Sequence, residues 1–183
     1  MLPVTLRTER LLLDAPTSDD YELVAEYCVD PLFEKFLTTP WPYTARDAKY
    51  FLNTLVPAGW DEDREFTWAI RESAGGPLLG VIGHRVALGD VGYWIGRPHR
   101  GNGFMTEAVG AVCDWLFDRG LDAVRWECIV GNSASASVAR KSGFTFSGTA
   151  PATIAYRDGS HPQSWHGVLD ARDSRDQKPG WPA

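Results

Sequence analysis

The sequence is poor in cysteine and histidine, and it contains no apolar run of membrane-spanning length. Its three cysteines are Cys28, Cys113 and Cys128, and its four histidines are scattered along the chain. Neither residue type has the spacing of a metal site, and an odd number of cysteines in apolar surroundings is typical of reduced core thiols. A membrane span needs about 20 consecutive apolar residues. We therefore expect no metal and no membrane partner.

A positive charge balance is also missing. The chain has 18 Lys and Arg against 24 Asp and Glu, which gives a formal net charge of −6 and a pI near 5.2. Since nucleic-acid binders concentrate positive charge, we expect no nucleic-acid partner. The N-terminal segment is acidic and interrupted by proline, unlike a signal peptide, and with the reduced thiols it predicts a cytoplasmic protein. A negative net charge is also compatible with a cationic amine substrate.

The length and composition are those of one globular domain. The chain has 183 residues, of which 44% are hydrophobic and 23% are charged. Such a chain is long enough to bury a full core. We expect residues 1–171 to form a single domain. Residues 172–183 are polar and contain two prolines, so we expect them to form a disordered tail.

The spacing of apolar and turn residues predicts a mixed α/β fold. A capping box at Thr17-Ser18-Asp19-Asp20 precedes a first helix, and Pro57 is expected to end a second one. This second helix and two later ones are expected over residues 45–55, 103–119 and 132–143. Strands are expected over residues 6–15, 66–70, 78–86, 91–95, 123–130, 144–149 and 164–170.

The segment Arg100-Gly101-Asn102-Gly103-Phe104-Met105 lies between the strand over 91–95 and the helix behind it. Two glycines allow a tight turn, and a helix N-terminus offers free N–H groups, so this is a candidate phosphate site. A P-loop is excluded because no Gly-Lys-Ser/Thr ending follows. A dinucleotide fingerprint, and with it an oxidoreductase, is disfavoured because Thr106 stands where a third glycine is needed.

The glycine segment resembles the Gln/Arg-x-x-Gly-x-Gly/Ala pyrophosphate loop of the GNAT acyltransferase superfamily, with Met105 in place of the final small residue. The segment from Asn132 to Phe144 resembles the Asn-x-x-Ser and Lys-x-Gly-Phe element of the same superfamily, at a matching separation. The opening Thr8-Glu9-Arg10-Leu11-Leu12-Leu13 is similar to that of the subgroup that acetylates ribosomal-protein N-termini. The resemblance implies a mainly antiparallel mixed central sheet flanked by helices and splayed between its fourth and fifth strands.

The resemblance also implies an acetyl-CoA site. The pantetheine arm would lie along the strand edge that enters the loop, and the amide near Ile95 would face the thioester carbonyl. The implied cofactor-binding residues are Trp94, Ile95, Gly96 and Arg97 on the strand edge, Arg100, Gly101, Asn102, Gly103, Phe104, Met105 and Thr106 in the loop, and Asn132 and Lys141 on the next helix.

The resemblance implies one residue as the catalytic acid but leaves the catalytic base open. Many superfamily members protonate the departing thiolate with a Tyr, but the matching position is Ala139. The subgroup instead places a Ser three residues after the Asn, so Ser135 is the implied catalytic acid. The segment after Phe144 has no carboxylate, which leaves the base open among Asp90, Glu107, Glu127 and water, with His84 less favoured. Trp41 is a candidate for the wall of the acceptor site.

These observations predict an N-acetyltransferase that uses acetyl-CoA as co-substrate. The expected acceptor is a primary amine, first of all a protein or peptide N-terminal α-amine, attacking directly in a ternary complex. A small-molecule or antibiotic amine, and a non-catalytic acyl-CoA-binding regulatory module, remain alternatives because acceptor loops vary on a shared scaffold. The sequence leaves open whether the protein is a monomer or a homodimer.

Overall fold

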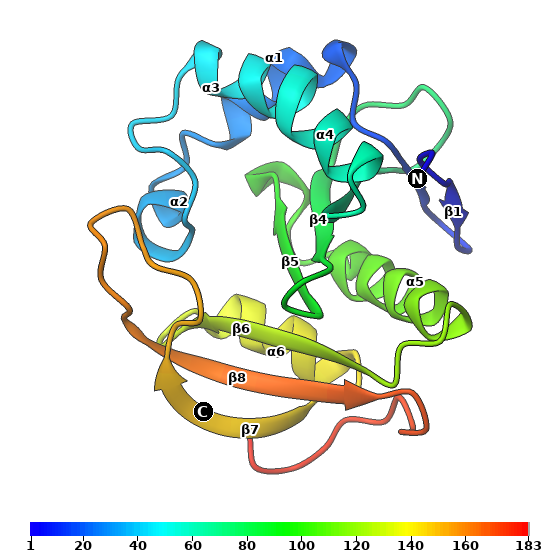
Figure 1. Cartoon of the computed structure of the whole chain (residues 1–183), viewed down its shortest axis with the longest axis vertical. Coiled ribbons are helices and arrows are strands. Elements are labelled where there is room, and N and C mark those ends of the chain that lie inside the picture. The colour runs from blue at the N-terminus through cyan, green and yellow to red at the C-terminus, as the bar shows by residue number, and fades with distance from the viewer. Residues whose placement is uncertain (183) are drawn as a thin grey trace.

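A computed structural model describes residues 1–182 of the chain. It shows one mixed, mainly antiparallel sheet of eight strands in the order β1-β2-β3-β4-β5-β6-β8-β7, with helices on both faces (Figure 1). This matches the predicted fold class. The strands are β1 (Leu6–Arg7), β2 (Leu12–Asp14), β3 (Glu65–Arg71), β4 (Gly80–Arg85), β5 (Asp90–Ile95), β6 (Ala123–Ile129), β7 (Thr145–Pro151) and β8 (Gln163–Asp170).

The sheet opens between β5 and β6. β4 and β5 pair antiparallel from Gly80 opposite Ile95 to Arg85 opposite Asp90. β5 and β6 are parallel and share the single pair Asp90 and Arg125. These are the fourth and fifth of the expected strands, so the predicted splay is confirmed. Beyond this pair the two strands diverge, and the rest of β5 presents its edge to the gap.

The expected strand over residues 6–15 is in fact two strands. β1 and β2 form a small antiparallel pair with Leu6 opposite Leu13. Between them the backbone N–H of Thr8 donates to Leu11 O (2.9 Å), and the Thr8 hydroxyl accepts from Leu11 N (2.9 Å). A threonine that bonds to nearby backbone in this way competes with a continuous strand ladder, which explains the break.

Four short helices precede β3: α1 (Tyr21–Tyr27), α2 (Pro31–Phe36), α3 (Ala45–Tyr50) and α4 (Val56–Asp61). Helices α1 to α3 cover one face of the first half of the sheet, whereas Val56 and Trp60 of α4 belong to the core cluster of the other face. The capping box at Thr17 and Asp20 is present, on a 3-10 turn over Ser18–Asp20. The expectation that Pro57 ends a helix is wrong. A π-helical turn, Phe51–Leu55, leads directly into α4, and Pro57 lies in the first turn of α4. The widened turn accommodates a residue that lacks an N–H and crowds the preceding turn.

The longest helix, α5 (Phe104–Asp118), packs on the opposite face, and α6 (Ser133–Lys141) lies beside β6 (Figure 1). Alternation along β3 divides the core. Trp68 and Ile70 belong to the cluster that contains Val109 and Val112 of α5, whereas Ala69 belongs to the cluster under α1 and α3. Because successive strand residues face opposite sides, both faces of β3 are buried.

The C-terminal tail differs from the expected disorder. Trp181 lies 5.4 Å from the ring centroid of Trp126 and 5.5 Å from that of Phe146, and Arg175 forms an ion pair with Asp114 of α5. An aromatic side chain that covers the β6 and β7 surface holds this segment, although its composition is polar. The end of the expected tail, residue 183, lies outside the described residues.

Candidate active site

The glycine loop presents backbone amides at the start of α5. Gly101 has φ 82° and Gly103 has φ 79°, a left-handed conformation that favours glycine. Gly103 is the N-cap of α5, and its carbonyl accepts from Glu107 N (3.1 Å). The N–H groups of the first turn, from Phe104 to Thr106, precede that first intrahelical bond. They lie at the positive end of a 15-residue helix, an arrangement that suits an anion.

Arg10 holds this loop from the N-terminal side. Its guanidinium donates to Asn102 O (3.1 Å), pairs with Glu107 Oε2 (2.6 Å) and lies over the Phe104 ring at 5.1 Å. Burial alone would raise the pKa of Glu107, but hydrogen bonds from Thr8 and Arg10 outweigh it and lower that pKa. Glu107 is thus an ionised anchor of the loop, which does not suit it as a general base.

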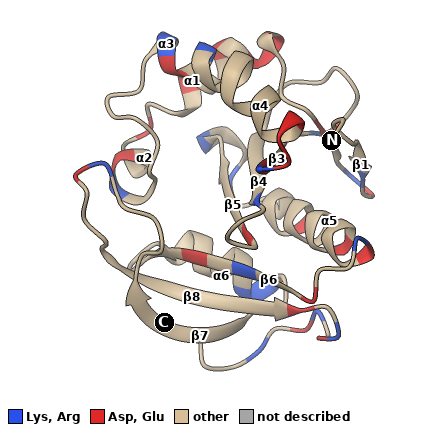
Figure 2. Ribbon diagram, viewed as in Figure 1, with Lys and Arg blue, Asp and Glu red and all other residues tan. Residues whose placement is uncertain are grey.

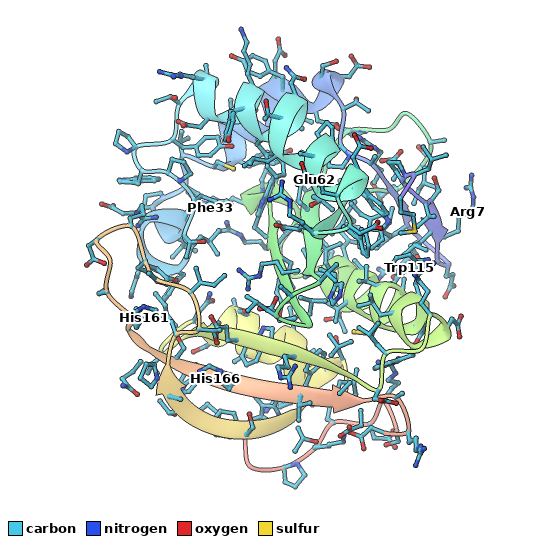
Figure 3. The ribbon with its side chains drawn as sticks, viewed as in Figure 1. Arg7, Phe33, Glu62, Trp115, His161 and His166 are labelled. Carbon is cyan, nitrogen blue, oxygen red and sulfur yellow. The ribbon has the colours of Figure 1, made fainter. Side chains whose placement is uncertain are left out.

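A cavity of about 340 Å³ runs from the glycine loop along β5 to α6. Most predicted cofactor residues line it: Trp94, Ile95, Arg100, Gly101, Gly103, Phe104, Met105, Thr106, Asn132 and Lys141. Phe33 of α2, labelled in Figure 3, also lines it and meets the Trp94 ring at 5.6 Å. The loop, the strand edge and the helix that the sequence singled out thus share one concavity.

Three predicted cofactor residues do not line this cavity. Gly96 donates its N–H to Leu79 O (2.8 Å), and a Cβ at this position would lie 2.7 Å from the Tyr27 ring. Gly96 therefore serves the packing of Tyr27 on the sheet. Arg97 is exposed in a 3-10 turn, Arg97–His99, and the Asn102 amide donates to the carbonyls of the same turn region.

Arg100 lines the cavity but does not offer a free charge. Its Nη1 lies 2.9 Å from Asp30 Oδ2, and its Nε donates to Ile95 O (3.3 Å). The ion pair offsets much of the attraction that this guanidinium would exert on a phosphate. Lys141 is exposed at the end of α6 and lines the same cavity, so it is the better placed cation.

The edge of β5 directs alternate amides into the splay. N–H and C=O groups of successive strand residues point to opposite sides. Gly96 bonds to Leu79 on the β4 side, whereas Gly89 O accepts from Arg125 N of β6 (2.8 Å). The backbone N–H and C=O groups of even-numbered β5 residues therefore point towards β4, and those of odd-numbered residues point towards β6. Because β6 has diverged beyond Asp90, the N–H groups of Tyr93 and Ile95 face the gap, as the resemblance implied for Ile95.

A second cavity, of about 250 Å³, lies on the other side of Trp94. Gly83 and Gly92, paired across β4 and β5, form part of its floor. A Cβ added to Gly92 would meet no heavy atom within 4 Å, so the missing side chain leaves open space. The two cavities share Tyr93, Trp94, Asn132 and Ser135 among their lining residues. Trp41, the predicted wall residue, lies outside both linings and packs against the cluster under α1 and α3.

Ser135 lies where the two cavities meet. Its N–H donates to the Asn132 side chain (3.3 Å), which caps α6. Its hydroxyl accepts from Trp126 Nε1 (3.2 Å) and donates to Tyr93 Oη (3.3 Å). Burial raises the pKa of Tyr93, which keeps it a phenol. The sequence did not relate the side chains of Tyr93 and Trp126 to Ser135, because only the fold brings β5 and β6 to α6.

Residues 10–145 match the family model described as the acetyltransferase (GNAT) domain. The chain belongs to the GNAT acetyltransferase family. It is 30% identical over 122 residues to an uncharacterized N-acetyltransferase p20 of Bacillus licheniformis, a match that covers 62% of this chain and 66% of that relative's length.

Solved structures share the GNAT fold of this chain at low sequence identity. A putative ribosomal-protein-serine acetyltransferase from Vibrio cholerae has a TM-score of 0.79 and 21% identity, covering 93% of this chain and 99% of that one. The microcin C7 self immunity acetyltransferase MccE, in complex with acetyl-CoA and AMP, has a TM-score of 0.73 and 19% identity, covering 89% and 93%.

Two carboxylates line the second cavity of this acetyltransferase, and one of them was not predicted. Of the candidate bases, Glu127 lines it and accepts from Thr153 N (3.1 Å) and Thr153 Oγ1 (2.6 Å). His166, labelled in Figure 3, lies 3.6 Å from the same carboxylate. Glu65, at the start of β3, leans over Gly83 and retains access to solvent. Burial by the surrounding protein nevertheless raises the pKa of Glu65.

The remaining base candidates have structural roles. Asp90 is buried and pairs with Arg85, with Nε 2.9 Å from Oδ1. His84 is buried in the sheet, its Nδ1 lies 3.0 Å from Asp90 O, and burial lowers its pKa, so it stays neutral. Acidic and basic residues are interspersed over the elements seen in Figure 2.

The connection between β7 and β8, which lines part of the second cavity, is hydrogen-bonded to the C-terminal end of α2. Arg157 donates to the carbonyls of Leu37 (2.7 Å) and Thr39 (2.7 Å), and Tyr156 donates to the carbonyl of Phe36. A cation is favourable at a helix C-terminus, where carbonyls lack intrahelical partners. In Figure 1 this connection reaches across to α2. We call these contacts of Tyr156 and Arg157 the α2 clasp.

Among the described residues 1–182, no helix has the length and apolar character needed to cross a membrane. Within the same residues, no three side chains of His, Cys, Asp or Glu come together in a way that could hold a metal ion.

Proposed function

We propose that this acetyltransferase transfers an acetyl group from acetyl-CoA to a primary amine, and that the preferred acceptor is a protein or peptide N-terminal α-amine. The observation that carries the proposal is the meeting of two cavities at Ser135. One cavity leads to the amides of the glycine loop, which suit a pyrophosphate. The other is lined by Glu65 and Glu127, which suit a cationic amine.

The residues of the chain fit acetyl-CoA as co-substrate. Gly101 and Gly103 add no side chain to the loop, and the N–H groups of Phe104, Met105 and Thr106 are free of intrahelical partners and available to an anion. The edge of β5 can pair with a peptide-like arm, and Asn132 lies beside it. When bound, acetyl-CoA supplies the activated thioester, and the protein supplies binding, orientation and charge stabilisation.

Each step then has a residue of this chain. The amides of Tyr93 and Ile95, which face the splay, stabilise negative charge on the carbonyl oxygen, where one donor contributes about 2.7–4 kcal/mol. Ser135 donates a proton to the departing sulfur. Glu65 accepts the proton of the acceptor amine, through water. An α-amine has a pKa of about 7.7–8.0, against about 10.4 for lysine, so a carboxylate acting at a distance suffices for an N-terminus.

The acceptor preference is tested with peptides. Lysine-free peptides with free N-termini should release CoA thiol from acetyl-CoA faster than the same sequences with a blocked N-terminus and one lysine, since the α-amine is partly neutral near neutral pH. Small primary amines form a third arm, because an acceptor of similar pKa reacts by the same chemistry. Mass spectrometry locates the product. Acetyl groups found mainly on lysine would contradict the preference, and no thiol release with any acceptor would favour a non-catalytic acyl-CoA-binding module.

The role of Glu65 is tested by the pH dependence of kcat/KM for an α-amine acceptor. Below the pKa of the amine, log kcat/KM should fall with a slope of one. Below the raised pKa of Glu65 the slope should become two, because amine and carboxylate must then both lose a proton. The Glu65→Gln variant should keep the slope of one and be slower at its plateau. Glu62→Gln, an exposed residue outside both cavities, is the matched control. A slope of one in the wild-type enzyme throughout the acid range would rule Glu65 out as the base.

A further inference from the structure

The indole N–H of Trp126 donates a hydrogen bond to the Ser135 hydroxyl oxygen, and this limits where the serine proton can point. Trp126 lies on β6 with 2% of its surface exposed, and its Nε1 is 3.2 Å from Ser135 Oγ. An indole N–H can only donate a hydrogen bond. The serine oxygen must therefore accept along this direction, and its own proton must point elsewhere.

Tyr93 occupies a second direction around the same hydroxyl. Its Oη donates to the carbonyl oxygen of Ser135 (3.0 Å) and lies 3.3 Å from Ser135 Oγ. Because the one phenolic proton is used on the carbonyl, Oη is left as the acceptor of the serine proton. The two bonds hold that proton at the junction of the two cavities, since Tyr93 and Ser135 line both.

The position of the indole is itself fixed from behind. The Trp181 ring packs 5.4 Å from Trp126, and a Cβ added to Gly167 of β8 would lie 3.3 Å from Trp126 Cε3. The ring therefore lies between Trp181 and the backbone of Gly167, where even a methyl group would be crowded, so the direction of its N–H is set by packing.

We propose that Trp126 and Tyr93 are positioning residues that hold Ser135 as the proton donor to the departing sulfur. This inference rests on the proposed function of Ser135. As the bond between the acetyl carbon and sulfur breaks, the serine proton forms the S–H bond. The serine proton leaves its hydrogen bond to Tyr93 Oη in this step. The serine oxygen is then left negative and accepts from the Trp126 N–H, while the Tyr93 O–H remains on the Ser135 carbonyl. The proton that Glu65 accepts from the amine passes on through water to the serine oxygen. This restores both the carboxylate and the hydroxyl, so the reaction yields the acetylated amine and the free thiol.

Trp126→Phe tests this by removing the N–H while keeping an aromatic ring in the core. We expect kcat to fall about tenfold, the size of one lost charge-assisted hydrogen bond, with unchanged acetyl-CoA affinity. In a Ser135→Ala background the same change should have no further effect on kcat. Tyr93→Phe should behave in the same way. Trp165→Phe, a half-buried indole of β8 that lines neither cavity, should retain wild-type kcat.

A second measurement needs no turnover. In the free protein, the indole N–H resonance lost in Trp126→Phe identifies Trp126. Ser135→Ala should shift that resonance and speed its exchange with solvent, whereas Ser133→Ala should not. If Ser135→Ala changes neither the shift nor the exchange rate of the Trp126 indole resonance, the inference is overturned, whatever the activity shows. A Trp126→Phe effect of equal size with and without Ser135 would also overturn it, since the indole would then act through packing. A normal kcat in Ser135→Ala would instead refute the acid role, and the inference with it.

Discussion

Gly103→Val is expected to weaken the binding of CoA or acetyl-CoA by about 100-fold or more, which corresponds to about 2.7 kcal/mol. Gly103 has φ 79°, and a β-branched residue is strongly disfavoured there. Backbone strain of this kind costs about 1–3 kcal/mol. An added Cβ would also lie 3.4 Å from Arg10 Nη2, so a branched side chain crowds the guanidinium that holds the loop where a pyrophosphate is expected. Both effects act on the loop, so the loss should appear in calorimetric binding of CoA.

The other end of the same helix provides the control. Gly120 follows α5 with φ 92°, and a Cβ there would meet no heavy atom within 4 Å. Gly120→Val therefore carries a similar backbone strain far from the cavity, and it should leave CoA affinity unchanged. An unchanged affinity in a folded Gly103→Val protein would show that the glycine loop does not hold the pyrophosphate.

Ser135→Ala is expected to lower kcat by about 100-fold, the usual contribution of a positioned acid, while acetyl-CoA affinity stays the same. The hydroxyl matters when charge develops on sulfur, so its loss should appear in kcat and kcat/KM alike. Steady-state kinetics with the best acceptor of the peptide panel measure this effect, and CoA binding is measured separately by calorimetry.

Ser133→Ala is the matched control, because Ser133 is an exposed residue at the first position of the same helix. Its kcat should match that of the wild-type enzyme. A loss of less than about threefold in Ser135→Ala, with chemistry shown to limit the rate, would exclude Ser135 as the principal acid.

Much of the fold could be predicted because its signals are local. Helix α5 follows a glycine turn with regular apolar spacing, and the sequence prediction of 103–119 differs from Phe104–Asp118 by one residue at each end. Most residues that line the first cavity could be predicted to lie together for the same reason, since loop, helix start and strand edge are contiguous in the sequence. The exceptions were residues whose local chemistry opposed the pattern, such as Thr8, which breaks a strand, and Pro57, which a π-helical turn accommodates.

The second cavity could not be predicted in this way. Glu65 stands at the start of a strand and is no different in sequence from a surface charge. Its place over Gly83 depends on the pairing of β3 with β4. Tyr93 and Trp126 come from two strands that touch at one pair only, so no spacing in the sequence relates them to Ser135. Trp181 belongs to a segment of polar composition, so composition alone did not predict that one aromatic ring would pack on Trp126 and hold the segment in place.

The α2 clasp has a mechanical consequence for the splay. Asp90 and Arg125 join β5 to β6 at one end, and Tyr156 and Arg157 tie the β7–β8 connection to the segment after Glu34. The two half-sheets are therefore connected at both ends of the gap between them, by the β5–β6 pair at one end and by the α2 clasp at the other. Widening the gap would break three or more hydrogen bonds at once. We expect acceptors of different size to be accommodated by rotation of the side chains that surround the open space at Gly92, while the angle between the two half-sheets stays constant.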